Sequence, residues 1–330
     1  MGIAFSFAAV IALIVLAFFG VAVLNLQILF GVIIPYAAFL AFIVGFVLKV
    51  VKWGRSPVPF RIPTTGGQGY SFSWIKQNKL DSPPNGLWVI GRMLLEVLVF
   101  RSLFRNTKSE LNSGKLVHGS EKFLWFFGLI FHWSFLIVLV RHFRFFMVNV
   151  PLPIKIMEAL DSFFQVGVPL VYITDLTLLL GVTYLFIRRV LMPQIRFISL
   201  PADYFPLLLI IAVAASGILM RYFIRVDIVG VKQVTMGLVS LHPTAPSSIG
   251  SIFYIHLFLV SVLFAYFPFS KLMHMGGVFM SPTRNLANNS RMVRHVNPWN
   301  YPVHVHTYSE YEDEFREKMI KAGLPVEKEQ

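Results

Sequence analysis

Six apolar stretches of about 20 residues alternate with polar segments along the chain. A helix needs about 20 apolar residues to cross a hydrocarbon core about 30 Å thick. The polar break Asn25-Leu26-Gln27 is short, so the first two helices should form a tight hairpin. Pro206 is expected in the first turn of the fifth helix, where its missing N–H does no harm. The pattern predicts membrane-spanning helices at about 3–24, 28–51, 123–147, 168–191, 205–224 and 250–272.

The polar segments complete the predicted organisation. An amphipathic stretch at 86–104 contains charged residues, so it should lie at the membrane interface or against a partner rather than span. The tail ends in a charged, helix-like run at 310–322. Loop and tail together are predicted to dock a partner, or else are simply solvated. We therefore predict an all-α membrane protein, a six-transmembrane-helix bundle that consists of an N-terminal two-helix hairpin (1–52), a loop (53–122), a four-helix core (123–280) and a tail (281–330).

Composition supports this class. Hydrophobic residues make up 56% of the 330 residues and charged residues 14%, which excludes an ordinary soluble domain. The chain has no cysteine, so disulfides, iron–sulfur clusters on this chain and covalently attached c-type haem are excluded. The first lysine is Lys49, so the apolar N-terminus lacks the basic region of a signal peptide.

The net charge of +13 reflects membrane topology rather than nucleic-acid binding. Most lysines and arginines fall in 49–122, 188–200 and 271–330. Because cytoplasmic loops carry the excess of positive charge, we expect a multi-pass protein of the cell membrane with both termini cytoplasmic. Six basic residues remain for the other side: Arg141, Arg144, Lys155, Arg221, Arg225 and Lys232.

Four of the nine histidines fall inside the predicted helices. His132 and His142 lie in the third helix, and His256 and His274 lie in the sixth. Ionisable side chains at membrane depth are rare and usually mark a functional site. Two axial histidines suit an electron-transferring haem because they leave no open position on the iron. We therefore predict two b-type haems, with structural or proton-relaying histidines as the alternative.

The order of the helices predicts which histidines pair. The third and sixth helices run antiparallel, so His132 should meet His274 (the inner pair) and His142 should meet His256 (the outer pair). The ten residues from His132 to His142 correspond to about 15 Å of helix, which suits two stacked haems. The 18 residues from His256 to His274 correspond to about 27 Å, so tilt and a kink at Pro268 must absorb the difference.

The rival function is a transporter that uses the intramembrane histidines and Asp175 for protons. Many transporters contain internal repeats, and the two halves of this chain show no convincing one. The other histidines lie outside the predicted helices, with no acidic or thiol partner at a recognisable metal-site spacing. They are His118, His242, His295, His304 and His306.

The motif H-x9-H, followed by H-x17-H around FPFSKLMH, resembles the cytochrome b (gamma) subunits of respiratory nitrate reductases over about 28–280. The resemblance implies that the four histidines ligate two b haems in the pairs given above. It also implies quinol oxidation near the outer haem, with a lysine taking part. The extra N-terminal helix and the longer loop depart from that family.

The loop segment PFRIPTTGGQ is similar to the membrane cytochromes of sulfite-reduction-associated, heterodisulfide-reductase-like menaquinol oxidoreductases. This similarity implies a cytoplasmic iron–sulfur partner subunit, with further membrane or outer-face redox subunits. It predicts an electron-transfer subunit that passes electrons from menaquinol through the outer and inner haems to that partner. A cytochrome b of a nitrate reductase-type complex is the alternative, and the reverse direction of electron flow stays open.

Lys155, within PLPIKIMEALD, matches the family's lysine. We expect it to donate a hydrogen bond to a quinone carbonyl, with Glu158 or Asp161 carrying protons outward. The alternative is a lysine that reaches the lipid headgroups.

Two more residues are candidates near the outer pair. Asp175 is expected about ten residues into the fourth helix without an obvious partner, where it would serve a proton path or a structural hydrogen bond. Arg141 and Arg144 flank His142 and are expected either to pair with haem propionates or to lie at the interface.

Overall fold

The computed structural model describes residues 2–56, 76, 78–162, 171–246, 249–287 and 305–327. The segment PFRIPTTGGQ and two of the tail histidines, His295 and His304, lie outside these residues. The helices are α1 (Gly2–Ala22), α2 (Ile34–Gly54), α3 (Gly86–Val99), α4 (Arg101–Phe104), α5 (Lys122–His142), α6 (Leu152–Asp161), α7 (Ile173–Leu191), α8 (Pro193–Ile198), α9 (Pro201–Ile218), α10 (Ile228–Val239), α11 (Ser251–Tyr266), α12 (His274–Gly277), α13 (Pro282–Asn285) and α14 (Tyr308–Lys321). The strands are β1 (Thr107–Asn112) and β2 (Lys115–Ser120), which pair antiparallel.

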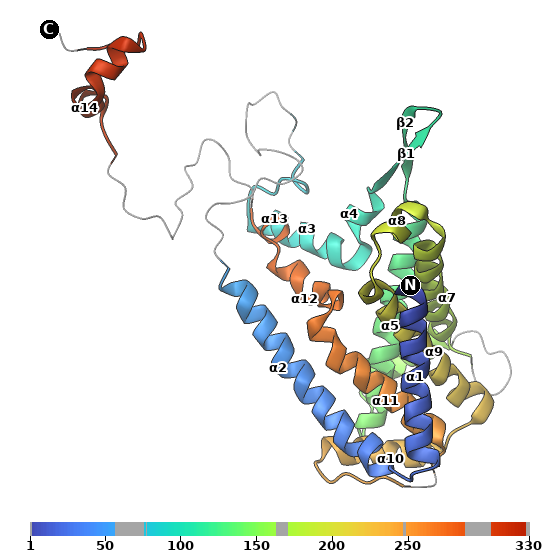
Figure 1. Cartoon of the computed structure of the whole chain (residues 1–330). Coiled ribbons are helices and arrows are strands. Elements are labelled where there is room, and N and C mark those ends of the chain that lie inside the picture. The colour runs from blue at the N-terminus through green and yellow to red at the C-terminus, as the bar shows by residue number, and fades with distance from the viewer. Residues whose placement is uncertain are drawn as a thin grey trace.

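The long helices α1, α2, α5, α7, α9 and α11 form a bundle in which successive helices alternate in direction (Figure 1). α5 packs on α7, α7 on α9, and α11 on both α9 and α2, while α1 lies against α9 and α11. The starts of α1 and α9 meet at one end, where Ser6 Oγ donates to the carbonyl of Pro201 at 3.0 Å. Apolar side chains such as Phe5 and Leu40 stay exposed on α1 and α2, as expected for helices that face lipid.

Within the described residues, five helical stretches are long and apolar enough to cross a membrane. α7 fills the place of the predicted fourth span, but its 19 residues include Asp175, Arg188 and Arg189. A crossing by α7 therefore stays a prediction. The five stretches are Gly2–Ala22, Leu29–Gly54, Lys122–Phe146, Pro201–Ile224 and Ser251–Phe269.

Two predicted helix starts are wrong. α7 begins at Ile173 rather than 168, and residues 163–170 lie outside the described part. α9 begins at Pro201, so Pro206 lies inside the helix and not in its first turn. A proline there removes the hydrogen bond to the carbonyl four residues earlier, that of Ala202. The Tyr266 hydroxyl donates to this carbonyl at 3.5 Å, so the carbonyl retains a donor.

The predicted helix at 250–272 is broken at Pro268, the residue where a kink was predicted. α11 ends at Tyr266, 3-10 turns follow at Phe267–Phe269 and Lys271–Met273, and Ser270 between them is extended with φ −118° and ψ 176°. Pro268 is fully buried at this break. His274 therefore begins a new short helix, α12, instead of continuing α11. The 18 residues from His256 to His274 therefore do not form one continuous helix, and the distance of about 27 Å expected for such a helix does not apply.

The predicted amphipathic stretch forms α3 and α4, which lie at one end of the bundle next to a β-hairpin (Figure 1). The apolar pattern gives no sign of this hairpin. Asp81 ties the segment before α3 to α4 through Arg101 at 2.6 Å and Arg105. The hydrogen bond from Arg101 is the largest influence on the pKa of Asp81 and, with that from Arg105, lowers it to about 2 although burial opposes the shift. α14 occupies the charged run predicted to be helical.

Candidate haem-binding site

The structure brings the four intramembrane histidines together in two pairs. His132, in α5, faces His274 at the start of α12, with ring centroids 5.9 Å apart and ring planes at 84°. His142, the last residue of α5, faces His256 of α11, with centroids 6.4 Å apart and planes at 16°. The break after α11 allows both contacts, because it lets His274 return toward α5.

Each of these imidazoles uses Nδ1 in a hydrogen bond within the protein. Nδ1 of His132 lies 2.7 Å from the carbonyl of Gly128, and Nδ1 of His142 lies 2.6 Å from that of Val138. Nδ1 of His274 lies 2.9 Å from the carbonyl of Lys271. A carbonyl only accepts, so these three rings carry the proton on Nδ1.

His256 has the same tautomer for a different reason. Its Nδ1 lies 2.9 Å from the hydroxyl of Ser216 on α9. The hydroxyl lies 3.0 Å from the carbonyl of Val213, and the His256 ring also hydrogen-bonds this carbonyl, which only accepts, so the ring proton is on the side that faces Ser216 and Val213. All four histidines therefore keep a lone pair on Nε2, which is the atom that can bind a metal.

The two pairs fit axial ligands of haem iron. An imidazole nitrogen ligates a metal at about 2 Å, so two rings on opposite sides of one ion have centroids on the order of 6 Å apart. Both observed separations agree with this spacing. Among the described residues, no group of three or more His, Cys, Asp or Glu side chains could hold a metal ion. Each pair thus suits a metal whose other ligands come from a macrocycle.

The end of α3 packs against the inner pair. The Phe100 ring lies 5.0 Å from the His132 ring at 90°, and Phe100 has a left-handed backbone with φ 52°. Two indoles of α5 hold this end: Trp133 Nε1 donates to the carbonyl of Leu98 at 2.9 Å, and Trp125 Nε1 to that of Val99 at 2.7 Å. These contacts were not predicted, because aromatic residues are common throughout the apolar sequence.

Arg141, beside the outer pair, is buried and binds carboxylates of the chain itself. It pairs with Asp161 at the end of α6 and with Asp175 at 2.7 Å. Its guanidinium also lies 3.5 Å from the centroid of the Tyr172 ring. These contacts favour a structural partner over the predicted haem propionate. The expectation that Asp175 lies deep in its helix without a partner is wrong, since it is in the first turn of α7 and is ion-paired.

Hydrogen bonds extend this charged cluster. The Tyr222 hydroxyl donates to Asp175 at 2.8 Å and accepts from the backbone N–H of Tyr172 at 2.9 Å. The Tyr172 hydroxyl donates to Glu158 at 2.5 Å, and Arg144 is ion-paired with the same carboxylate. Burial of these charges is tolerated because each carboxylate has a cation or a hydroxyl donor.

Lys155 lies on the exposed side of α6, and its side chain has no hydrogen-bond or ion-pair partner among the described residues. The remaining described histidines are apart from the two pairs. His118 is in the hairpin, 2.9 Å from Ser109 Oγ, and His306 lies 3.9 Å from Glu314 in the tail. His242 is exposed after α10.

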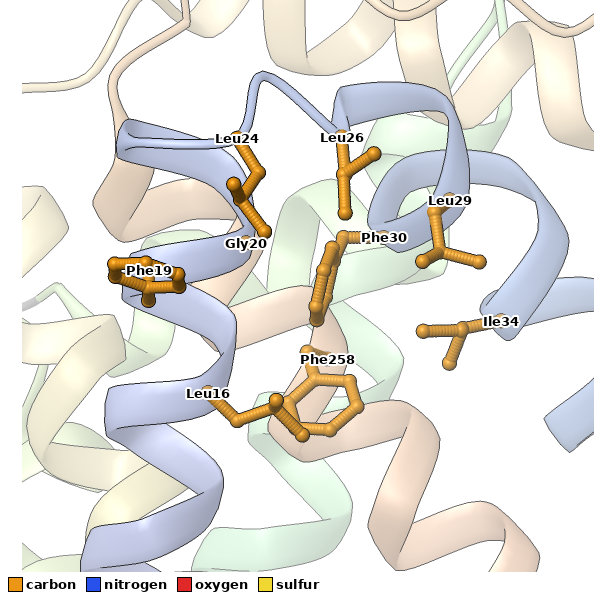
Figure 2. A pocket seen from close by; sticks show the side chains of 9 residues that line it. All are labelled: Leu16, Phe19, Gly20, Leu24, Leu26, Leu29, Phe30, Ile34 and Phe258. Carbon is orange, nitrogen blue, oxygen red and sulfur yellow. The ribbon is translucent and has the colours of Figure 1, made fainter.

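An apolar crevice of about 220 Å³ opens between α1, the start of α2 and α11. Figure 2 shows Phe30 above Phe258, with leucines closing the sides. Phe258 is two residues from His256, so the crevice lies in the half of the bundle that contains the outer pair. Its lining contains no polar side chain, so it suits hydrocarbon and cannot orient a polar headgroup.

Comparison with known proteins identifies the family. Residues 88–296 match the model of the nitrate reductase gamma subunit family, and this range contains all four paired histidines. The chain belongs to the nitrate reductase gamma subunit family. This gamma-subunit match starts within α3, so α1 and α2 lie outside it.

Two relatives match most of the length of this chain. An "Hdr-like menaquinol oxidoreductase cytochrome b-like subunit" of Archaeoglobus fulgidus is 44% identical over 279 residues, which are 82% of this chain and 83% of the relative. A protein of the same description from Archaeoglobus profundus is 40% identical over 274 residues, 81% of each chain. The resemblance inferred from FPFSKLMH and PFRIPTTGGQ is thus confirmed.

Proposed function

We propose that this chain is the dihaem cytochrome b subunit of a menaquinol oxidoreductase. The observation that carries the proposal is the presence of two facing histidine pairs whose Nδ1 atoms are all hydrogen-bonded within the protein. His142 and His256 would hold the outer haem, and His132 and His274 the inner one. When bound, each haem supplies one-electron redox chemistry at an iron with no open position.

The haem content tests this proposal directly. We expect a dithionite-reduced minus oxidised spectrum of b type and two haems b per chain. His132→Ala and His142→Ala should each lose one haem, and a different one, because each substitution removes a ligand of one pair. His118→Ala is the matched control, since that histidine lies in the exposed hairpin. A chain with one haem, or with none, contradicts the proposal.

The partner is proposed to be a heterodisulfide-reductase-like iron–sulfur subunit on the cytoplasmic side. The names of the two relatives support a complex of this kind. The chain has no cysteine, so the clusters that accept its electrons have to belong to another subunit. Electrons would leave menaquinol near the outer pair and pass toward this partner, and further membrane or outer-face redox subunits would complete the complex.

Menaquinol is proposed to bind beside α6, next to the outer pair. Lys155 is exposed there with its ammonium available, so it can donate a hydrogen bond to a quinone oxygen. Glu158 and Asp161, proposed to carry protons outward, are on the same helix but are held by Arg144 and Arg141. Asp175, with its hydrogen bond from Tyr222, would receive protons nearest to the outer pair.

We expect Lys155→Ala to slow menaquinol-driven haem reduction by about tenfold. The reason is that the substitution removes one hydrogen bond, and a loss of about 1.4 kcal/mol corresponds to a tenfold change in rate. The haem content should stay unchanged. Stopped-flow reduction of the haems by a menaquinol analogue measures the rate, and Lys232→Ala, on α10, serves as the control. A wild-type rate in the Lys155 variant would remove this residue from the site.

A further inference from the structure

One side of α2 packs along the chain segment that contains His274. Phe42 contacts the rings of Phe264 and Phe267, with centroids 5.2 and 5.5 Å away. Gly45, Phe46 and Trp53 continue the same side at helical spacing. Their neighbours are the 3-10 turn after α11 and the short helix α12. This stripe of α2 therefore lies against the break in the sixth span and the turn beyond it.

The closest approach is at Gly45. A Cβ atom on this residue would lie 2.7 Å from Cβ and 2.9 Å from Cγ of Pro268. The proline ring is rigid and fully buried, so it cannot move aside cheaply. The absence of a side chain at Gly45 is therefore what allows α2 to contact the break directly.

The next two contacts reach α12 itself. A Cβ atom on Gly276 would lie 3.2 Å from Cζ of Phe46, and one on Gly277 would lie 3.5 Å from Cη2 of Trp53. Two glycines, two and three residues after His274, thus receive two aromatic rings from α2 (α2 and α12 are neighbours in Figure 1). Large rings against bare backbone leave α12 little freedom to shift toward α2.

The segment 267–277 needs such support because its own secondary structure is too short to hold its position. α12 has four residues, and the preceding chain is interrupted by the extended Ser270. His274 is exposed in the chain alone, and its ring contacts the carbonyl of Lys271 and the ring of His132. On the other side, Lys271 Nζ lies 2.5 Å from Asp203 of α9, which ties the turn to the bundle through a mostly exposed lysine.

We propose that α2, which lies outside the matched family range, is the positioning element for the inner haem ligand His274. Gly45, Phe46 and Trp53 are the positioning residues. These residues fix the position of the backbone at 267–277. They would therefore determine the orientation in which the His274 imidazole approaches the iron. The inference rests on the proposed ligation of the inner haem by His132 and His274.

Gly45→Ala tests the inference in the complete protein in membranes. The added Cβ should displace Pro268 and weaken the bond from His274, so that the inner haem gains an open position and binds carbon monoxide. We expect no carbon monoxide binding in the wild type and binding at one of the two haems in Gly45→Ala. The low-field EPR signal of that haem should change while the other stays, since it reports the orientation of the axial rings. Gly54→Ala is the matched control on α2, because its Cβ would meet nothing closer than Cε of Met280 at 3.9 Å.

Phe46→Ala decides the matter if the Gly45 variant does not accumulate. It removes a ring from Gly276 without adding bulk, and the exposed Phe39→Ala on the same helix is its control. An altered inner-haem EPR signal in Phe46→Ala, absent in Phe39→Ala, supports the inference. Two b haems with wild-type signals in the variants overturn it. A wild-type protein without two b haems instead overturns the proposed function.

Discussion

At the scale of single residues, the hydrogen bonds to Nδ1 determine what the histidines can do. Three rings donate to backbone carbonyls three or four residues earlier, which any helix supplies. His256 differs because its partners, the hydroxyl of Ser216 and the carbonyl of Val213, lie on another helix. When Nδ1–H of a ligating imidazole donates a hydrogen bond, Nε2 becomes a more basic ligand, which favours the ferric state of the iron. Ser216 is therefore expected to tune the outer haem alone.

Ser216→Ala should raise the midpoint potential of the outer haem. The shift should be on the order of tens of millivolts, since a tenfold change in a one-electron equilibrium is about 59 mV. A redox titration of the separated haem signals measures it. Ser261→Ala is the control, because Ser261 is also buried but donates to the carbonyl of Leu257 within its own helix. Equal potentials in Ser216→Ala and the wild type would exclude the tuning role.

The chemistry of the site was predictable from residue type, but its supporting contacts were not. The four histidines stand out because ionisable groups are rare in apolar sequence. Phe100 and Ser216 do not stand out, since many aromatic and hydroxyl residues share their surroundings in the sequence. Arg141 and Asp175 were each predicted to be important, but the ion pair between them was not. These residues are 34 positions apart in the sequence, and their contact depends on how the helices pack.

At the scale of elements, apolar length predicts the helices well and their ends poorly. The spans near α1, α2, α5 and α9 follow the apolar runs, because the position of each span is determined by side chains that are buried or face lipid. The errors occur at proline and at polar residues. α9 continues upstream through Pro206, where the Tyr266 hydroxyl lies 3.5 Å from the freed carbonyl, and the sixth span breaks at Pro268. The hairpin β1–β2 is short and exposed, so no hydrophobic periodicity marks it.

At the scale of the whole molecule, the distribution of charge divides the bundle into two ends. The end with α3, α4 and the hairpin carries most basic residues, and the opposite end carries α10. From the positive-inside rule we expect α3, α4 and the hairpin on the cytoplasmic side, where the proposed iron–sulfur partner would bind. The inner histidine pair lies toward this end, since the end of α3 packs on His132.

The cysteine-free sequence allows a direct test of this orientation. A membrane-impermeant maleimide should label Val229→Cys in intact spheroplasts, because Val229 is exposed on α10. Lys115→Cys, at the tip of the hairpin, should be labelled only in inverted vesicles. The unmodified protein, which has no cysteine, is the blank. Labelling in the opposite pattern would invert the topology and exchange the inner and outer haems.

The ion pair between Arg141 and Asp175 also bears on how the chain enters the membrane. A single aspartate or arginine at the centre of a helix raises the free energy of insertion by about 2.5–3.5 kcal/mol. The three charged residues of α7 lie in its first and last turns, where the cost is smaller. Ribosomes make α5 before α7, so Arg141 is already present when Asp175 emerges. Arg141, which also binds Asp161, partly neutralises the charge of Asp175, and the close fit of Gly181 against the backbone of Phe131 lets the helices meet. We therefore expect the predicted crossing by α7 to be more favourable as one half of a hairpin with α5 than as a helix alone.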